Sequence, residues 1–423
     1  MKIFFDSIGC KLNQSEIEKM AGRFRAFGHV IISSPEDADY VVINTCAVTN
    51  AASADSRKAI RRAARLGSGK IIATGCYATV DPTAIQSLPS VECIVCNDAK
   101  ENIPELLLNK GNQLLVKQTP RIPLPGNRKR TRAFIKIQDG CNNNCTFCVT
   151  RIARGKSRSL EVKEIFRDIS AALEGGVKEI VLTGVNLGAW GLDFDITSTL
   201  ADLLKQIIKE LQPPRLRLSS LEPWDIDERL IDTFLLGGFC RHLHIPLQSG
   251  CDEILKRMGR KINHSDYHRL LTKVRKIIPG VAITTDIIVG FPGESENKFE
   301  QSVRFIRDME FAGGHVFRFS PRPGTPAARY SGIPEIQVTK KRSERIREGF
   351  AISQSKYQAQ FLNKTLPVLW QEAKNTKGQW NLSGLSDNYI NIQAESKSNL
   401  ENCISTVMIN ETRLKSLFGE IIN

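Results

Sequence analysis

Apolar runs and amphipathic segments alternate in the first part of the chain. The pattern predicts strands at residues 2–8, 40–45 and 70–75, and helices at residues 13–27 and 52–66. Strands that alternate with helices of this length form a parallel sheet. We therefore expect an α/β domain over residues 1–119.

A second alternation begins near residue 132. Six apolar runs predict strands near residues 132–138, 179–184, 215–221, 242–248, 281–290 and 314–320. Amphipathic segments between them predict helices near residues 161–174, 197–211, 227–236, 264–277 and 295–310. Six such units predict a partial (β/α)6 barrel over residues 132–356, with a last helix at 336–356 that leaves the barrel. The functional residues of such a barrel lie at the carboxyl ends of its strands.

The pattern changes again after about residue 357. Short apolar runs there are separated by Gly, Asn and Ser, which predicts a small antiparallel β domain over residues 357–423. A five-stranded barrel is one form that such a domain can take. Trp370, Trp380 and Tyr389 either pack in its core or stack on the bases of a nucleic acid.

The formal charge of the chain is +14, and the excess lies in its central part. Residues 120–140 contribute +5 and residues 141–356 contribute +7, whereas residues 357–423 sum to zero. Residues 120–131 contain prolines, a glycine and no acid, which predicts a basic linker. A polyanion such as nucleic acid is the natural partner of a basic surface, although such a surface can also be merely solvated.

The predicted helix 52–66 is cationic on one side and apolar on the other. Arg57, Arg61 and Arg65 recur every four residues, while Ile60 and Ala63 mark the apolar stripe. This helix and the linker together provide candidate contacts to nucleic-acid phosphates, namely Arg57, Lys58, Arg61, Arg62, Arg65, Arg128, Lys129 and Arg130. Several contacts of this kind predict binding that weakens steeply with salt.

Three cysteines lie within eight residues, directly after the first strand of the predicted barrel. Cys141, Cys145 and Cys148 have the spacing Cys-x3-Cys-x2-Cys, with no fourth ligand nearby. A 4Fe-4S cluster normally takes four thiolates, so three leave one iron open to a small molecule. The alternative is a structural zinc site, which needs a fourth ligand, and the nearest histidine downstream is His242.

Three further cysteines, Cys10, Cys46 and Cys76, each follow a predicted strand of the first domain. Because the carboxyl ends of parallel strands share one edge of a sheet, we expect these thiols to converge and to hold a second iron-sulfur cluster. The alternative is three unrelated buried thiols. The other cysteines are interpreted as non-ligands, namely Cys93, Cys96, Cys240, Cys251 and Cys403.

Cysteine usage also bears on location. The count of 11 is odd, and the chain begins without a basic and then apolar leader. No run approaches the roughly 18 apolar residues of a membrane span. We therefore expect a cytoplasmic protein without a membrane segment, in which thiolates are free to bind metal.

Together these motifs resemble the radical S-adenosylmethionine (SAM) methylthiotransferases over essentially the whole chain. In the first domain the resemblance rests on Gly9-Cys10-Lys11-Leu12-Asn13, Asn44-Thr45-Cys46-Ala47-Val48-Thr49-Asn50 and Thr74-Gly75-Cys76-Tyr77. In the second it rests on the triad at Cys141 to Cys148, Ala153-Arg154-Gly155, His244-Ile245-Pro246-Leu247-Gln248 and Gly290-Phe291-Pro292-Gly293-Glu294. The first-domain motifs are most similar to the branch that acts on tRNA threonylcarbamoyladenosine, the modified base beside the anticodon.

The resemblance implies a chemistry for these motifs. SAM would bind the open iron of the cluster on Cys141, Cys145 and Cys148, and its cleavage would yield a radical that takes hydrogen from C2 of the modified adenine. The cluster on Cys10, Cys46 and Cys76 would hold the incoming sulfur, and a second SAM would supply the methyl group. The expected partners are tRNA, an electron donor and a sulfur donor. The last domain is expected to be an RNA-binding TRAM barrel.

Further residues are expected to support this chemistry. Thr183, Gly184 and Gln248 follow or end predicted strands and are expected to contact SAM. Arg154 and Arg158 are expected to meet the SAM carboxylate or the tRNA backbone, since a guanidinium pairs with either group through two hydrogen bonds. Phe147 either stacks near the adenine of SAM or packs within its own loop.

Other functions remain open at this point. Sister branches of the family act on tRNA isopentenyladenosine or on an aspartate of a ribosomal protein. A protein of another class would bind RNA and use its clusters only as structural elements.

Overall fold

The structure is a computed structural model that describes residues 1–108, 124, 131–413 and 416–422. Its first domain is a parallel sheet in the order β2-β1-β3-β4-β5. The strands are β1 (Lys2–Ser7), β2 (Val30–Ile32), β3 (Tyr40–Thr45), β4 (Lys70–Gly75) and β5 (Val91–Val95). The helices are α1 (Lys11–Ala26), α2 (Asn50–Leu66), α3 (Cys76–Val80), α4 (Pro82–Gln86) and α5 (Ile103–Leu108), with a 3-10 turn η1 (Lys100–Asn102).

Helices cover both faces of this sheet because its central strands are apolar on both sides. Ile43 of β3 packs with Ile60 of α2 on one face, and its neighbour Val42 packs with Ile17 of α1 on the other. Thr49 caps α2, since its hydroxyl accepts a hydrogen bond from the backbone N–H of Ala52 at 3.1 Å. The predicted strands 40–45 and 70–75 are confirmed as β3 and β4.

The central part contains six parallel strands that follow one another in chain order. They are β6 (Arg132–Lys136), β9 (Glu179–Thr183), β10 (Leu216–Leu218), β11 (His242–His244), β12 (Ala282–Val289) and β13 (Gly313–Arg318). Three strands pair as β6-β9-β10 and three as β11-β12-β13, and a parallel bridge between Ser220 and His244 joins the two groups. The partial barrel predicted from the sequence is thus confirmed.

Helices surround this barrel on its outer side. The longer ones are α7 (Val162–Glu174), α8 (Leu200–Glu210), α11 (His264–Ile277), α12 (Glu296–Asp308) and α13 (Ile336–Ala359). Short elements fill the loops, namely β7 (Gln138–Asp139), α6 (Thr150–Arg154), β8 (Arg158–Ser159), η2 (Leu187–Ala189), η3 (Pro223–Asp225), α9 (Glu228–Asp232), η4 (Thr233–Leu236), α10 (Asp252–Arg257) and η5 (Pro326–Arg329). The predicted strand 242–248 ends early at His244, because the chain soon reaches Pro246, which has no N–H for a ladder.

The C-terminal strands form a closed barrel in the order β14-β15-β16-β18-β17. They are β14 (Thr365–Thr376), β15 (Gln379–Ser386), β16 (Asn391–Ser396), β17 (Ile404–Arg413) and β18 (Ser416–Ile421). Pairing of β14 with β17 closes the barrel. One detail of the prediction was wrong, because β16 and β18 pair in parallel within an otherwise antiparallel barrel. Trp370 is fully buried in the core, and its indole N–H donates to the Ser405 hydroxyl at 3.0 Å.

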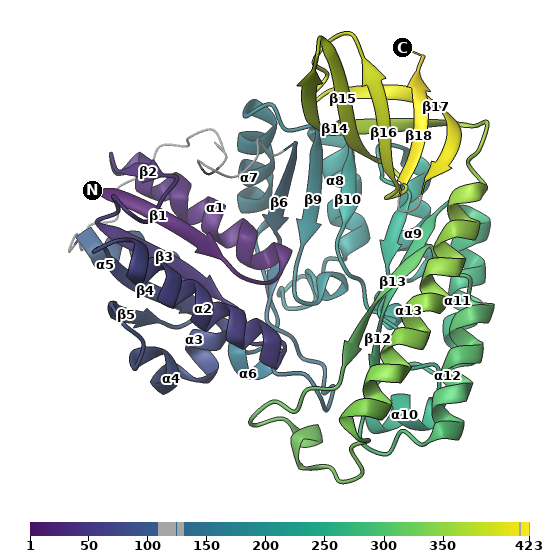
Figure 1. Cartoon of the computed structure of the whole chain (residues 1–423), viewed down its shortest axis with the longest axis horizontal. Helices are drawn as coiled ribbons and strands as arrows, with labels where there is room; N and C mark the ends of the chain where they lie inside the picture. Colours follow the sequence, from purple (N-terminus) through teal and green to yellow (C-terminus); the bar gives the residue numbers. More distant parts are fainter. Residues whose placement is uncertain (109–123, 125–130, 414–415, 423) are drawn as a thin grey trace.

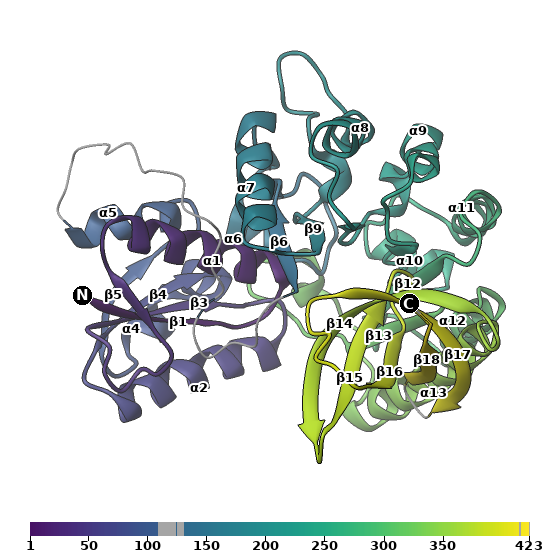
Figure 2. The same ribbon diagram turned by 90° about the horizontal axis from the view of Figure 1, so that it is seen from above.

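The first domain and the C-terminal barrel pack on different sides of the central barrel (Figures 1 and 2). Helix α1 packs along β6, which is one free edge of the partial barrel. The N-terminal end of α2 reaches the loop after β13, the other edge, where the Asn50 N–H donates to the Ser320 hydroxyl at 3.2 Å. The first domain therefore spans the opening between β6 and β13.

No helix within the described part of the chain combines the length and apolar character required to cross a bilayer.

Candidate iron-sulfur and substrate site

The structure places Cys10, Cys46 and Cys76 at the carboxyl ends of three adjacent strands. Cys10 lies between β1 and α1, Cys46 follows β3, and Cys76 is the first residue of α3 after β4. Gly9 precedes Cys10 with φ +101°, and a side chain there would bring its Cβ within 2.7 Å of the Cys46 sulfur. Only glycine lets the chain turn out of β1 without filling the space beside that thiol.

Polar donors surround these three sulfurs. The Arg154 Nε donates to the Cys76 sulfur at 3.2 Å, and the Asn97 side-chain amide lies 3.7 Å from the same atom. The Cys10 thiol contacts the side-chain oxygen of Asn13 at 3.7 Å. Burial raises the pKa of the Cys46 thiol to about 11, and the proximity of Cys10 and Cys76 adds to the shift.

The second triad occupies the loop between β7 and α6. Backbone hydrogen bonds fix this loop to the loops after β11 and β13: the Thr146 N–H donates to the Met258 carbonyl, and the Thr146 carbonyl accepts from the Ala327 N–H, both at 2.9 Å. Phe147 packs against a cluster from other loops that includes the buried Phe291 and Cys251, and its predicted contact with the adenine of SAM stays a prediction.

Each sulfur of the second triad also has a polar neighbour. The backbone N–H of Asn143 donates to the Cys141 sulfur at 3.4 Å, and Arg260 Nη1 lies 3.8 Å from the Cys145 sulfur. Burial raises the pKa of Cys145, while Arg260 opposes the shift. A cationic donor beside a thiol favours the thiolate, which is the form that binds iron.

Each triad offers thiolates, the ligands of an iron-sulfur cluster. Within the described residues, no three His, Cys, Asp or Glu side chains are arranged around one point as ligands of a single ion. Each thiolate of an iron-sulfur cluster binds a different iron, so its sulfurs need not converge on one point. The zinc alternative also loses its fourth ligand, because His242 is buried at the start of β11, where its Nε2 lies 3.0 Å from the Thr284 hydroxyl.

The mouth of the central barrel carries buried polar atoms that lack a partner in the structure. These atoms are Asn186 Oδ1, Ser219 Oγ, Asp225 Oδ2 and Asp286 Oδ1, and they follow or lie on β9, β10 and β12. Buried polar groups normally have hydrogen-bond partners, so this set fits a polar ligand such as the amino-acid or ribose part of SAM.

The predicted SAM residues lie around this mouth. Thr183 ends β9, and Gly184 follows it in close contact with Gln138, whose side-chain oxygen accepts from the Asn186 N–H at 2.8 Å. Gln248 has the left-handed φ of +75° and bridges to Ile287 of β12. A side chain in this region is strained, and strain of this kind is concentrated at functional sites.

Arg154 corrects the sequence-based prediction. It was expected to meet the SAM carboxylate or the tRNA backbone, but its side chain is only 2% exposed. Its guanidinium is already engaged by Glu16 and Asp139, each at 2.9 Å, and it lies inside the contact between the first domain and the barrel. A phosphate cannot reach it there. Arg158, in contrast, is exposed on β8, and its predicted role stays a prediction.

The interior of the barrel holds a line of polar side chains that the sequence did not indicate. The Thr284 hydroxyl lies 3.0 Å from His242 Nε2 and 3.0 Å from His244 Nδ1, and His244 Nε2 lies 3.2 Å from Asp286 Oδ2. His315 and Phe317 of β13 are exposed on the same side of the sheet. These groups face the opening that the first domain spans.

Helix α2 presents most of its cations to solvent, as the sequence predicted. Lys58, Arg61, Arg62 and Arg65 are exposed, while Ile60 and Ala63 are buried. Arg62 pairs with Asp6 at 3.1 Å, and Lys58 lies 3.5 Å from Asp55. Arg57 is half-buried and donates to the Tyr77 hydroxyl at 2.8 Å. The linker candidates Arg128, Lys129 and Arg130 lie outside the described residues.

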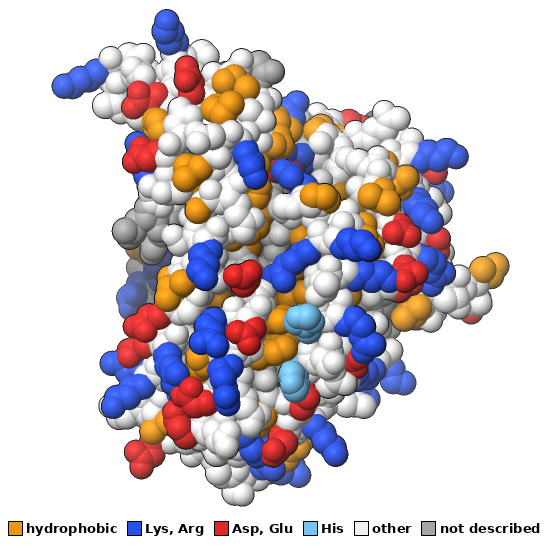
Figure 3. Space-filling view, turned by 90° about the vertical axis from the view of Figure 1, so that its right-hand side faces the viewer, with side chains coloured by type: hydrophobic (Ala, Val, Ile, Leu, Met, Phe, Trp, Pro, Cys, Tyr) orange, Lys and Arg blue, Asp and Glu red, His pale blue; other side chains and the backbone are white. Residues whose placement is uncertain are grey.

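The helical face of the central barrel differs from α2. On this face, cationic and anionic side chains are interspersed (Figure 3). An example is Arg345 of α13, which pairs with Glu300 of α12. Interspersed charges do not create a field of one sign, so α2 is the better candidate for phosphate binding.

Sequence reasoning missed the residues that organise the two triads. These residues are Asn13, Glu16, Asn97 and Arg260. Asn97 and Arg260 are distant in sequence from the cysteines that they contact, and Glu16 acts through Arg154. Only Asn13 is near its cysteine, three residues after Cys10. Asn13 belongs to the motif that carried the family resemblance, and that motif was the one available signal.

Comparisons with known proteins agree with this site. The Radical SAM superfamily matches residues 135–306, and the uncharacterized protein family UPF0004 matches residues 2–97. The chain is 39% identical to the threonylcarbamoyladenosine tRNA methylthiotransferase MtaB of Thermotoga maritima, over 91% of this chain and 89% of that protein. It is 36% identical to the MtaB of Bacillus subtilis, over 92% and 89%. The tRNA-2-methylthio-N(6)-dimethylallyladenosine synthase of Bacillus subtilis is 30% identical, over 100% and 86%.

Solved structures share the fold at low identity. The radical SAM methyltransferase TsrM from Kitasatospora setae, with cobalamin and a [4Fe-4S] cluster bound, matches with a TM-score of 0.58 and 14% identity, over 77% of this chain and 76% of that chain. A radical SAM domain binds SAM and a 4Fe-4S cluster, and the Cys141, Cys145 and Cys148 loop lies within the matched segment. On these grounds the chain belongs to the radical SAM methylthiotransferases.

Proposed function

We propose that this chain is a tRNA methylthiotransferase that places sulfur and a methyl group on C2 of threonylcarbamoyladenosine, the modified adenosine beside the anticodon. One observation carries the proposal: the two cysteine triads lie in adjacent loops. Helix α6, which follows Cys148, packs on α3, which begins at Cys76. Two sites this close can act on the same atom of one substrate.

In this proposal Cys141, Cys145 and Cys148 hold one 4Fe-4S cluster, and Cys10, Cys46 and Cys76 hold a second. A cluster with an open iron supplies the one-electron cleavage of SAM, and hence a radical strong enough to remove hydrogen from an aromatic carbon. The protein binds and orients the reactants. The unpartnered polar atoms at the barrel mouth bind the polar parts of SAM, and Thr183, Gly184 and Gln248 shape that pocket.

The open side of the barrel admits the base. His315 and Phe317 line this opening and offer flat surfaces to a base that leaves the anticodon stack. Exposed cations of α2, which belongs to the domain that spans the opening, bind phosphates of the same loop. Arg61 and Arg65 carry most of this role because neither forms an ion pair with another described residue.

The branch assignment rests on sequence identity. The two MtaB relatives are 39% and 36% identical to this chain, whereas the dimethylallyladenosine synthase is 30% identical. The reaction also needs an electron donor and a sulfur donor, which we propose as further partners in the cytoplasm.

The proposal is tested with the full chain after anaerobic reconstitution with iron and sulfide. The protein is incubated with SAM, dithionite and one of three substrates: tRNA with threonylcarbamoyladenosine, tRNA with isopentenyladenosine, or the ribosomal protein. Mass spectrometry of the products should find methylthio groups only on threonylcarbamoyladenosine. Modification of either other substrate instead would contradict the branch, and absence of deoxyadenosine would favour clusters with a purely structural role.

A further inference from the structure

Arg154 connects the two cysteine triads directly. It ends α6, six residues after Cys148, yet its Nε donates to the Cys76 sulfur of the other triad at 3.2 Å. Its Nη2 donates to the side-chain oxygen of Asn13 at 2.7 Å, the same oxygen that the Cys10 thiol contacts. The Arg154 guanidinium thus contacts Cys76 directly and Cys10 through the side chain of Asn13.

The remaining donor of Arg154 reaches both chain segments that meet at this contact. Its Nη1 donates at 2.9 Å to Glu16 of α1 and at 2.9 Å to Asp139, two residues before Cys141. The planar fork of an arginine can make these contacts together, whereas the single ammonium of a lysine cannot. The arrangement therefore depends on arginine and not only on positive charge.

A buried ion network holds this arginine in place. Glu16 also pairs with Lys100 at 2.6 Å, and it accepts a hydrogen bond from the Asn44 side chain at 3.0 Å. Lys136 lies 3.7 Å from Asp139 and 2.6 Å from Glu101. Arg154 and Lys100 lower the pKa of Glu16 well below its usual range despite burial. The members of the network are buried apart from Glu101, whose side chain is 44% exposed.

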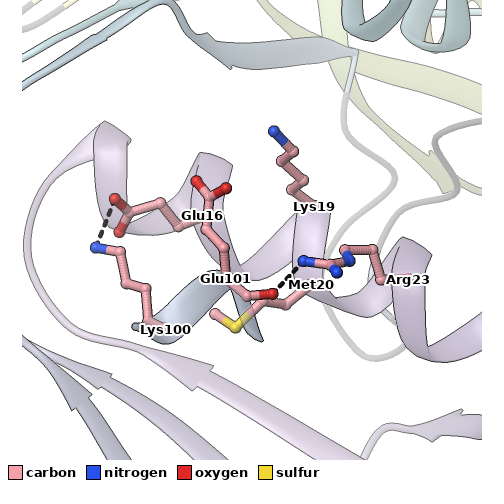
Figure 4. Close-up of a pocket in the computed structure, with 6 residues that line it drawn as sticks. All are labelled: Glu16, Lys19, Met20, Arg23, Lys100 and Glu101. Carbon is pink, nitrogen blue, oxygen red and sulfur yellow. Dashed lines mark hydrogen bonds and ion pairs between the residues drawn. The ribbon is translucent and has the colours of Figure 1, made fainter. Parts of the chain in front are cut away.

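Figure 4 shows the far side of this network, where Glu16 points toward Lys100 and Arg23 toward Glu101. These side chains, together with Lys19 and Met20, line a small pocket. The charged groups in it already have partners: Glu16 pairs with Lys100, and the others pair with residues outside the pocket, namely Lys19 with Glu164, Arg23 with Glu105 and Glu101 with Lys136. The pocket is therefore the outer face of the ion network, and we assign it no ligand.

We propose that Arg154 is a positioning residue that fixes the Cys10, Cys46 and Cys76 site against the Cys141, Cys145 and Cys148 site, and that raises the reduction potential of a cluster on the former. The inference rests on the proposed function, because it assumes that the first triad holds a cluster. Hydrogen bonds and positive charge at a ligand sulfur stabilise the more negative, reduced state of a cluster. Arg154 supplies both to Cys76.

The test isolates the first triad. The parent carries Cys141→Ala, Cys145→Ala and Cys148→Ala, so that only the first triad can bind a cluster. Its midpoint potential is measured by electron paramagnetic resonance during a redox titration, in the parent and with Arg154→Lys or Arg154→Gln. We expect a lower potential in both variants, which lose the arginine Nε–H at Cys76, and the larger shift for Arg154→Gln, which also loses the positive charge.

Two further variants separate this effect from general damage. Arg154→Gln removes one cationic partner of Glu16, which keeps Lys100, and one of Asp139, and the loss of one member of a buried ion network is destabilising. The double variant Arg154→Gln with Glu16→Gln also removes a nearby negative charge, so its potential should fall by less than that of Arg154→Gln but should stay below that of the parent, because the N–H donor to Cys76 is lost. Arg217→Lys changes another fully buried arginine, which pairs with Glu179 at 2.7 Å in the barrel interior. This control should leave the potential of the first cluster unchanged.

A second readout uses the chain with both triads intact. Arg154→Lys should still release deoxyadenosine, because the second triad is complete. The ratio of methylthio product to deoxyadenosine should fall about 10–100-fold, the usual range for a group that supports a metal ligand. A structural role alone would lower both products together.

The outcomes are distinguishable. An unchanged potential in Arg154→Lys and in the double variant would overturn the inference while leaving the proposed function intact. A parent that binds no iron at the first triad would overturn the proposed second cluster, and the inference with it. A fall in potential that Arg217→Lys reproduces would also count against a specific role of Arg154.

Discussion

The ring of Tyr389 lies flat on the ring of His242, with centroids 4.2 Å apart and planes 14° from parallel. Tyr389 lies in the turn between β15 and β16 of the C-terminal barrel, and His242 begins β11 of the central barrel. Arg217 lies over the same tyrosine ring at 5.0 Å, and Arg241 pairs with Asp387 at 2.6 Å. The C-terminal barrel is therefore docked on the amino end of the central barrel by specific contacts.

Replacing Tyr389 by Ala should weaken this docking. The stacked pair is worth about 0.5–1.5 kcal/mol beyond the area that it buries, so the variant should unfold at a lower temperature and expose the C-terminal barrel to proteases. Tyr389→Phe keeps the ring and should behave like the original chain. Equal stability and protease resistance of Tyr389→Ala would show that the stack does not hold the two barrels together.

The two triads should fail in different ways when one ligand is removed. Cys145→Ala should abolish release of deoxyadenosine from SAM, because the site that cleaves SAM loses a thiolate. Cys46→Ala should keep this release but form no methylthio product. Chromatography of deoxyadenosine and mass spectrometry of tRNA nucleosides measure the two outcomes. Deoxyadenosine release by Cys145→Ala at the rate of the original chain would refute the division of roles.

Reversing charge on α2 should weaken tRNA binding in a salt-dependent way. Each phosphate contact contributes about 0.7–0.9 to the slope of log affinity against log salt. The double variant Arg61→Glu with Arg65→Glu should therefore lower this slope by about 1–2, as measured by filter binding at several salt concentrations. Arg347→Glu, at an exposed position of α13, is the matched control. If the control lowers the slope equally, α2 is not the phosphate-binding surface.

Asp225 should make stability depend on pH. Burial, and then the nearby Glu222, raise its pKa to about 6, whereas an aspartate in an unfolded chain has a pKa of about 3.9. The folded chain thus binds this proton more tightly, so its stability falls as the pH rises from about 4 to 6 and stays lower above that range. The loss is on the order of 2 kcal/mol.

Asp225→Asn removes this titration. Denaturant unfolding of the iron-free protein should find the variant more stable than the original chain near pH 7.5, with little difference near pH 4, within about 1 kcal/mol. Its buried Oδ2 has no hydrogen-bond partner in the structure, so loss of the charge should leave few contacts broken. A variant that is less stable near pH 7.5 would show that the carboxylate is held by a favourable contact.

The sequence predicted most of the fold because its apolar periodicity is strong and its connections are short. The strands β3 and β4 and the helix α11 have the predicted bounds. The strand β2 was not predicted, and β10 was predicted too long, because three residues give little periodic signal. The parallel pairing of β16 with β18 depends on how a barrel closes, which no local pattern encodes.

The sequence predicted those parts of the candidate site that depend on the spacing of cysteines along the chain and on their positions at strand ends. The position of each cysteine after a strand was enough to bring Cys10, Cys46 and Cys76 together. The environment of Arg154 was not predictable, because it is created by Glu16, which is 138 residues away and belongs to another domain. An arginine followed by a glycine has the same appearance in sequence whether it faces a phosphate or a buried carboxylate.

The central claim is that this chain adds a methylthio group to threonylcarbamoyladenosine in tRNA. Mass spectrometry of tRNA nucleosides from cells that lack the protein tests this most directly, beside cells in which the gene has been restored. We expect the methylthio form of threonylcarbamoyladenosine to disappear, threonylcarbamoyladenosine without the methylthio group to accumulate, and methylthio-isopentenyladenosine to be unchanged. A normal level of methylthio-threonylcarbamoyladenosine in cells with no other enzyme of this branch would contradict the account.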